Sequence, residues 1–203
     1  HSAMWNTIGC HPHQAKTWDK ESKSHFSELI LSARPVAIGE TGLDYYYGEE
    51  RKAEQQKRFA VHLNASKACK KPVIVHTRDA RADTLEIIER EGDINIGGVL
   101  HCFTESWDMA SRAMDMNYYI SFSGIVTFRN AAELREVAKA IPDDRILVET
   151  DSPYLTPVPF RGKPNSPRHV LDVAKCVAEI RQQPLELLCK NTSDNFNRLF
   201  IKG

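Results

Sequence analysis

Hydrophobic and polar residues follow two different periods along this chain. Short runs rich in valine, isoleucine and leucine, bounded by glycine, proline or polar residues, are typical of buried strands. Longer stretches with hydrophobic residues three or four positions apart are typical of amphipathic helices. The pattern predicts strands at Trp5–Cys10, Val36–Glu40, Val73–Thr77, Gly97–Phe103, Tyr119–Ile125 and Ile146–Asp151. It predicts helices at Lys20–Ser32, Glu49–Cys69, Ala80–Glu91, Ser106–Met116 and Asn130–Ile141, a sixth from Ser166, and a seventh at about Pro184–Phe200.

This alternation of strand and helix predicts an α/β fold with right-handed crossovers and a parallel sheet. Gly92 is a plausible stop for the helix before it, and Asn130, three residues before Glu133, is a plausible N-cap. No repeat, low-complexity tract or linker divides the chain, so we expect residues 1–203 to form a single domain. One long irregular stretch, Ser152–Asn165, follows the last predicted strand.

The charge balance limits the partners of this protein. The 203 residues include 27 Lys plus Arg and 27 Asp plus Glu, so the formal net charge is zero. This balance argues against a protein that coats long nucleic acid, which usually carries a basic stripe. It leaves room for an enzyme that grips one or two phosphates.

The cysteines and the hydropathy of the chain bear on its compartment. There are five cysteines and no C-x-x-C pair, which favours free thiols in a reducing compartment. No apolar run approaches the ~18 residues that a membrane span needs, and no basic and apolar leader is present. We therefore expect a cytoplasmic protein that makes no contact with a membrane.

Four of the predicted strands end in a group that titrates or binds metal: Glu40, His76, His101 and Asp151. Parallel strands finish at one edge of a sheet, and parallel barrels place their active sites at that carboxyl-terminal face. Two imidazoles and two carboxylates there suit a divalent metal, or two metals that share a carboxylate. Glu149, two residues before Asp151, faces the same side and either reaches this site or forms a buried structural pair.

Five motifs around these residues, in this order, resemble the TatD family of metal-dependent deoxyribonucleases. They are GETGLDYYYG at 39–48, PVIVHTRDA at 72–80, GGVLHCF at 97–103, YISFSGIVTF at 119–128 and LVETDSPYL at 147–155. The resemblance covers the chain from about Trp5 to Phe200. It implies a (β/α)8 TIM-type barrel that binds up to two divalent metal ions per site, Mg²⁺, Mn²⁺ or Zn²⁺.

The resemblance also implies roles for individual residues. Glu40 matches a carboxylate that bridges two metals, and His76 and His101 match the imidazole ligands of the second metal. Asp151 matches the carboxylate that binds the first metal and takes the proton of the attacking water. Glu40 and Asp151 are therefore the expected catalytic residues. The loop that carries Arg161 and Lys163 resembles the segment beside the substrate mouth.

The segment IGCHPHQ, residues 8–14, contains two histidines one residue apart. It resembles the family's GVHPH segment after the third strand, and not the metal-binding H-x-H of the first strand. Pro12 argues against a regular strand there, because proline removes a ladder donor. We expect His11 to line the site and touch substrate, and His13 to be structural or solvated.

This alignment of motifs predicts an incomplete barrel. Six strands are predicted, whereas the barrel has eight, so the chain resembles a member that lacks the first two βα units. An open barrel would expose sheet edges, which favours pairing with a second copy. The metal site would then lack the H-x-H pair.

Two further features next to the predicted site have open interpretations. Arg78 either clamps a phosphate, whose geometry matches guanidinium, or forms a salt bridge with Asp79 or Asp83. The three tyrosines at 45–47 offer a stacking surface for a terminal base, but packing is the favoured role for at least two of them. His62 lies within a helical pattern and is interpreted as a surface or packing residue.

Together these features predict a metal-dependent phosphodiesterase that acts on DNA ends, as a 3′-to-5′ exonuclease on single strands. Two alternatives stay open. One keeps the chemistry and changes the substrate to another ester or an amide. The other is a non-catalytic fragment that retains a metal site without turnover, because the H-x-H is absent.

Overall fold

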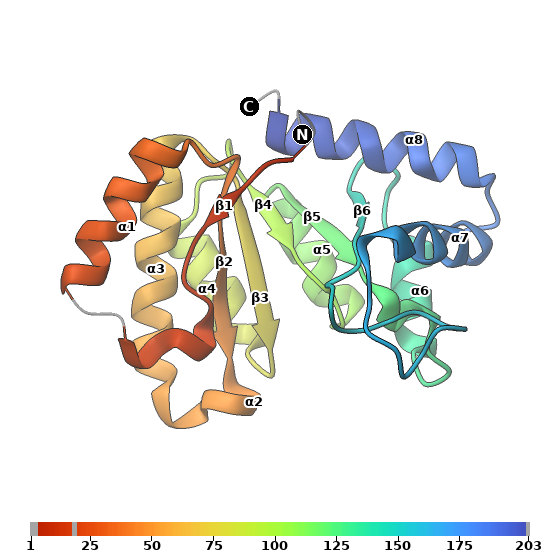
Figure 1. Cartoon of the computed structure of the whole chain (residues 1–203), viewed down its shortest axis with the longest axis horizontal. Helices are drawn as coiled ribbons and strands as arrows, with labels where there is room; N and C mark the ends of the chain where they lie inside the picture. The colour runs from red at the N-terminus through yellow and green to blue at the C-terminus, as the bar shows by residue number, and fades with distance from the viewer. Residues whose placement is uncertain (1–3, 18–19, 202–203) are drawn as a thin grey trace. The chain divides into compact units, whose positions relative to one another are not determined.

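The computed structural model describes residues 4–17 and 20–201, which form two compact α/β units (Figure 1). Unit 1 comprises residues 1–100 and 199–203, and unit 2 comprises residues 101–198. All six predicted strands are present in the structure, and their paired neighbours within each unit run parallel. The predicted α/β class is therefore confirmed. The prediction of one domain over residues 1–203 stays a prediction.

Four parallel strands in chain order form the sheet of unit 1. They are β1 (Thr7–Ile8), β2 (Ala37–Asp44), β3 (Val73–Arg78) and β4 (Gly98–Leu100). The first is shorter than predicted, because the chain turns into a 3-10 helix, η1 (Pro12–Thr17), soon after it. The second is longer than predicted and runs four residues beyond Glu40.

The helices of unit 1 connect and cover these strands. They are α1 (Lys20–Ala33), α2 (Tyr45–Gly48), η2 (Glu49–Arg51), α3 (Lys52–Cys69) and α4 (Arg81–Glu91). Of the three long helices, α1 packs on β1, α3 on β2 and α4 on β3 (Figure 1). Helix α3 ends where Lys70 adopts a left-handed conformation, two residues before Pro72, and α4 ends at Gly92 as predicted.

A local irregularity shapes the carboxyl half of β2. The register against β3 shifts between Ile38 and Thr41, which is the signature of a bulge, and bulges re-aim side chains next to functional sites. Beyond it Gly42 pairs with His76 at a positive φ of 134°. A Cβ at Gly42 would overlap the carbonyl oxygen of His76, so only glycine permits this close approach of the two strand ends.

Unit 2 is built around two parallel strands, β5 (Tyr118–Phe122) and β6 (Ile146–Val148). Its helices are α5 (Trp107–Asp115), η3 (Gly124–Thr127), α6 (Ala132–Ala140), η4 (Pro167–His169), α7 (Val170–Ile180) and α8 (Leu185–Phe196). A π-helical turn, η5 (Asn197–Ile201), follows α8 and belongs to unit 2 up to Arg198 and to unit 1 from Leu199. The predicted cap at Asn130 is wrong: Ala131 occupies the N-cap position of α6 and makes no side-chain cap.

The irregular segment predicted after the last strand is present in unit 2 and is held internally. The Asn165 side chain donates to the carbonyl oxygens of Thr150, at 2.7 Å, and Tyr154, at 2.6 Å. Asn165 is itself buried. One amide side chain thus ties both ends of the loop that follows β6, which carries Asp151.

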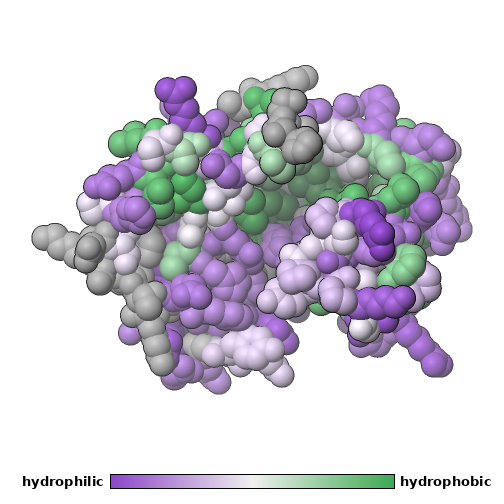
Figure 2. All heavy atoms as spheres, in the orientation of Figure 1, coloured by the Kyte–Doolittle hydropathy of each residue, from purple (hydrophilic) through white to green (hydrophobic). Residues whose placement is uncertain are grey.

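Each unit has its own hydrophobic core. The largest fully buried side chains of unit 1 are Phe59, Ile38, Leu43, Leu63, Leu85 and Leu100, and those of unit 2 are Phe103, Phe122, Met109, Ile120, Ile141 and Ile146. On the face in Figure 2, hydrophobic residues also gather at the surface over α1 and β1 of unit 1. Within residues 4–17 and 20–201, no helix has the length and apolar character to cross a membrane.

Candidate metal centre

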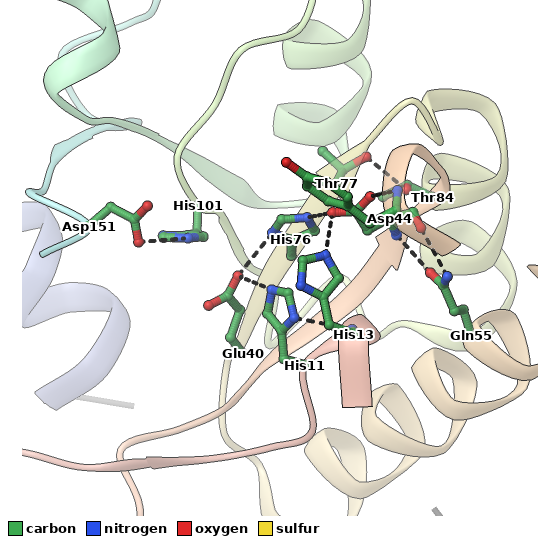
Figure 3. Close-up of polar contacts among 11 residues, drawn as sticks. His11, His13, Glu40, Asp44, Gln55, His76, Thr77, Thr84, His101 and Asp151 are labelled. Atoms are coloured by element: carbon green, nitrogen blue, oxygen red, sulfur yellow. Dashed lines mark hydrogen bonds and ion pairs between the residues drawn. The ribbon is translucent and has the colours of Figure 1, made fainter. Parts of the chain in front are cut away.

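Strands β2 and β3 and the segment after β1 bring three potential metal ligands together in unit 1 (Figure 3). Glu40 lies on β2, His76 lies on β3, and His11 follows β1. His76 Nδ1 is 3.0 Å and His11 Nε2 is 3.4 Å from the same Glu40 oxygen, Oε1. All three side chains are partly buried, with 20–29% of each exposed. The structure therefore confirms that Glu40 and His76 converge, and it adds His11 to them.

The donor set and its spacing fit a divalent cation. Two nitrogens and one carboxylate form a set that suits zinc, manganese or iron. Metal bonds of 2.0–2.2 Å at a tetrahedral angle place two ligand atoms ~3.4 Å apart. The three donor atoms of this cluster all lie within 4.8 Å of one another. Small side-chain shifts would therefore bring them around one ion.

Asp44 is the buried anchor of this cluster. Its side chain is only 1% exposed, and Oδ2 lies 3.1 Å from His76 Nε2 and 2.8 Å from His13 Nε2. Its other oxygen accepts the amide hydrogen of Tyr47 and so caps α2. Gln55 fixes the Asp44 backbone through two hydrogen bonds, of 2.7 and 2.9 Å.

These contacts keep Asp44 ionised. Burial alone would raise its pKa, but the hydrogen bonds from His76, the Tyr47 amide and His13 outweigh burial and hold the pKa well below its usual range. A permanent negative charge therefore lies behind both imidazole rings.

The two carboxylates on His76 determine which nitrogen can serve as a ligand. Burial would lower the pKa of His76, but hydrogen bonds to Asp44 and Glu40 outweigh it and raise the pKa. Both contacts need a ring proton, because an ionised carboxylate only accepts hydrogen bonds. The contact with buried Asp44 keeps the proton on Nε2, so a cation would displace the proton on Nδ1, the nitrogen that faces Glu40. A carboxylate behind a ligating histidine is the usual support of a protein metal site.

His11 is less prepared to bind metal than His76. Its Nδ1 accepts the amide hydrogen of His13 at 3.2 Å, which leaves the ring proton on Nε2. Nε2 is the atom that faces Glu40, so His11 is arranged to donate to that carboxylate. Ligation through Nε2 would require the proton to move to Nδ1 and the contact with His13 to break. A hydrogen-bonding role agrees with the predicted substrate contact of His11, which stays a prediction.

His62, on α3, holds the segment that carries His11. Its Nε2 accepts the amide hydrogen of Cys10 at 3.0 Å, and its Nδ1 contacts the carbonyl oxygen of Arg58 at 2.9 Å. The ring is fully buried, and burial lowers its pKa to about 4. The sequence-based interpretation of His62 as a packing residue is therefore incomplete, because the neutral ring also fixes the backbone next to His11.

The other two predicted ligands, His101 and Asp151, lie in unit 2 and face each other there. His101 Nε2 is 3.8 Å from Asp151 Oδ1 (Figure 3). His101 Nδ1 is 2.7 Å from Glu149 Oε1. The contact between His101 and Glu149 is short but not aligned as a hydrogen bond. The buried Glu149 Oε1 therefore has no hydrogen-bond donor in the part of the chain that the structure describes. Of the two interpretations of Glu149, its contact with His101 favours a place in the site.

The predicted substrate residues outside the cluster lie at the surface. Arg78, at the end of β3, is exposed and stacks on the rings of Tyr46 and Tyr47. Arg161 and Lys163 lie on the loop after β6, where Arg161 stacks on Phe128 with its guanidinium carbon 3.7 Å from the ring centroid. Their roles in substrate binding stay predictions.

Sequence analysis missed Asp44 and assigned His13 no role in the site. The predicted strand stopped at Glu40, because the following residues are mostly glycine and polar. A signal was available, since Asp44 directly precedes the short helix Tyr45–Gly48 and aspartate is a favoured N-cap. Nothing in the sequence alone indicates that the same carboxylate reaches His13 and His76.

Parallel strands followed by helices, with histidines and carboxylates on or directly after the strands, are typical of metal-dependent hydrolases of the α/β barrel class. Comparison with known proteins agrees: residues 1–201 match the family described as TatD related DNase. The chain belongs to the TatD family and is a metal-dependent hydrolase.

Three similar proteins illustrate this membership. The Escherichia coli protein YcfH, an uncharacterized metal-dependent hydrolase, is 53% identical over 96% of this chain and 72% of its own length. The 3′-5′ ssDNA/RNA exonuclease TatD of Cronobacter sakazakii is 37% identical over 100% of this chain and 79% of its own. The crystal structure of YjjV, a TatD homologue from Escherichia coli, superposes with a TM-score of 0.93 over 98% of this chain and 78% of that one, at 27% identity.

Proposed function

We propose that this protein is a phosphodiesterase that shortens single-stranded DNA from its 3′ end. The observation that carries the proposal is the pair Glu40 and His76, with a buried, ionised Asp44 behind the imidazole. The relative named as a 3′-5′ ssDNA/RNA exonuclease supports the choice of substrate.

The residues of unit 1 have separate tasks in this proposal. Glu40 and His76 hold a divalent cation, and Asp44 keeps the His76 ring oriented. The bound cation supplies a Lewis acid that activates water and stabilises charge on the phosphate. Arg78 offers a guanidinium to that phosphate, because its planar fork matches phosphate geometry.

The family resemblance implies roles for further residues, in unit 2 and in the segment after β1. His101 and Asp151 are the further ligands that it implies, and Asp151 is the group that accepts the proton of the attacking water. Arg161, Lys163 and His11 are the further substrate contacts. Each of these roles is part of the proposal, and substitution of the residue concerned tests it.

The partners and compartment also belong to this proposal. None of the five cysteines forms a disulfide, and free thiols fit a reducing compartment such as the cytoplasm. Pairing of two copies through an open sheet edge is the predicted form of self-association. Sedimentation of the purified chain at several concentrations tests it.

A DNA-shortening assay tests the main proposal. The chain is incubated with a 5′-labelled single-stranded oligonucleotide and Mg²⁺, Mn²⁺ or Zn²⁺, with a chelated control. We expect metal-dependent shortening from the 3′ end. Ester and amide substrates are assayed in parallel, and hydrolysis of one of them without any DNA cleavage would contradict the proposed substrate class.

A further inference from the structure

Helix α2 presents two tyrosines to solvent beside the metal centre. The side chains of Tyr46 and Tyr47 are 58% and 63% exposed, whereas Tyr45 is buried. Packing was the favoured role for at least two of these three residues, and the structure shows that only Tyr45 packs. The two exposed rings lie edge to face, with 4.7 Å between their centroids.

Arg78 completes this surface, and we call Tyr46, Tyr47 and Arg78 the aromatic platform. Its guanidinium carbon lies 4.0 Å from the Tyr46 ring centroid and 4.9 Å from that of Tyr47. Stacking on two rings holds the guanidinium in place without neutralising its charge.

The charge of Arg78 stays available for a ligand. Among the described residues, Arg78 forms no ion pair with a carboxylate, and its contacts are with the rings of Tyr46 and Tyr47. One of the two partners that the sequence offered, Asp83, instead accepts hydrogen bonds from Tyr45, at 2.6 Å, and Gln56, at 2.8 Å. The salt-bridge interpretation of Arg78 with this residue is therefore wrong.

The platform is joined to the metal centre through shared contacts. The Tyr47 amide donates to Asp44, the same carboxylate that holds His76. The Tyr47 ring lies edge-on to the His13 ring, with 5.3 Å between centroids, and the His13 ring lies 4.4 Å from that of His11. One buried carboxylate thus sets the position of both the platform and the metal ligand.

We infer that the aromatic platform stacks the terminal base of a single-stranded nucleic acid while Arg78 binds a neighbouring phosphate. Exposed aromatic faces bind bases of any sequence, and a guanidinium matches the phosphate that accompanies each base. A localised grip also fits a chain with no net charge, since the attraction does not depend on a basic stripe. The choice of a single-stranded nucleic acid as the ligand rests on the proposed function. The inference adds the subsite that would hold the terminal base of that strand.

Binding of two oligonucleotides tests the platform without turnover. Fluorescence anisotropy with the full chain in chelator compares a 5′-labelled single strand that has a normal 3′-terminal nucleotide with one whose terminal nucleotide is abasic. In the wild type we expect loss of that base to weaken binding about 5- to 150-fold, the range for one stacked base. In the double variant Tyr46→Leu with Tyr47→Leu, loss of the terminal base should weaken binding less than about 2-fold.

A second variant separates stacking from charge. Arg78→Met should weaken binding of both oligonucleotides alike and reduce the dependence of binding on salt. Two matched controls lie in unit 2: Tyr154→Leu removes a tyrosine that is 69% exposed, and Arg145→Met removes an arginine stacked on Tyr119. Both controls should keep the full preference for the terminal base, and circular dichroism verifies that each variant is folded.

The outcomes distinguish the platform from the proposed function. The inference is wrong if the wild type does not bind the single strand, or if it binds the normal and the abasic oligonucleotide equally well. It is also wrong if the double tyrosine variant keeps the wild-type preference for the normal oligonucleotide. DNA shortening measured in parallel with metal can still succeed in those cases. A preference for the base that the tyrosine variant loses supports the platform, even if no metal produces cleavage and the proposed function fails.

Discussion

Each unit of this protein holds a histidine between two carboxylates, but the two histidines are held differently. His76 in unit 1 has Glu40 at 3.0 Å from Nδ1 and buried Asp44 at 3.1 Å from Nε2, both aligned as hydrogen bonds. His101 in unit 2 has Glu149 at 2.7 Å from Nδ1 without alignment, and Asp151 at 3.8 Å from Nε2.

The difference indicates how much of each site exists before a metal arrives. The His76 ring is fixed from behind by a carboxylate that is 1% exposed, so its ligand nitrogen is already aimed. The carboxylates around His101 are 20% and 30% exposed, and one buried oxygen lacks a hydrogen-bond donor. We infer that the first cluster is preorganised, whereas the second has to adjust when a cation or substrate binds.

Removal of the preorganised histidine should have the largest effect. His76→Ala should lower kcat/KM for metal-dependent hydrolysis at least ~1,000-fold, because a bound metal supplies several kcal/mol of charge stabilisation. The assay measures shortening of single-stranded DNA at saturating metal. His169→Ala is the matched control, since that buried histidine contacts Asp172 and the Phe160 ring and is not one of the predicted metal ligands. Hydrolysis by His76→Ala at the wild-type rate would remove the metal centre from the mechanism.

Acid should weaken the support of the first cluster through His62. Its folded pKa of about 4 lies below the ordinary 6.5, so the folded state binds fewer protons than the unfolded state. The stabilisation is complete above pH ~6.5 and is lost as the pH falls toward 4, by about 3 kcal/mol in the free energy of unfolding.

Urea unfolding at several pH values between 4 and 7 measures this loss. His62→Gln provides the control, because glutamine keeps a donor and an acceptor but does not titrate in this range. The variant should show a flatter dependence of stability on pH. Equal slopes in both proteins would assign the acid sensitivity to other groups.

Substitution of one carboxylate beside each histidine compares the support of His76 with that of His101. Asp44→Asn keeps the cap on α2 but removes the charge behind His76, so kcat/KM should fall about 10- to 100-fold. Glu149→Gln should cost less than ~10-fold, because its contact with His101 lacks hydrogen-bond alignment. Steady-state kinetics at saturating metal separates the two variants. Losses of the same size would mean that the two histidines are equally supported.

His13 should have the smallest effect of these residues. It provides one of the three hydrogen bonds to the Asp44 carboxylate, and its side chain is 44% exposed. His13→Asn should therefore lower kcat/KM by less than ~10-fold, the size expected for one solvent-screened hydrogen bond. A loss as large as that of Asp44→Asn would show that His13 has a role beyond holding the carboxylate.

The sequence was sufficient for the fold class and for the strand ends that carry chemistry. All six strands were predicted from short β-branched runs, and Glu40 and His76 were recognised because they end such runs. The boundary of β2 was wrong by four residues, because its last half has little hydrophobic pattern and is fixed by pairing with β3 and by the close approach at Gly42.

The contacts behind the ligands could not be predicted in the same way. Asp44 reaches His13 across 31 residues of sequence and His76 across 32, and His62 reaches Cys10 across 52. Such pairs depend on tertiary packing, which produces no periodic pattern in the sequence. The exposure of Tyr46 and Tyr47 was missed for a related reason, since a run of tyrosines carries no signal for which ring faces the core.

Calorimetric titration with Zn²⁺ or Mn²⁺ tests the central claim most directly. The wild type, Asp44→Asn, His76→Ala and the His169→Ala control are titrated under identical conditions. We expect the wild type and the control to bind with the same affinity, Asp44→Asn to bind about 10- to 100-fold more weakly, and His76→Ala to bind more weakly still. Unchanged affinity in both Asp44→Asn and His76→Ala would contradict the claim that this cluster is the preorganised metal centre.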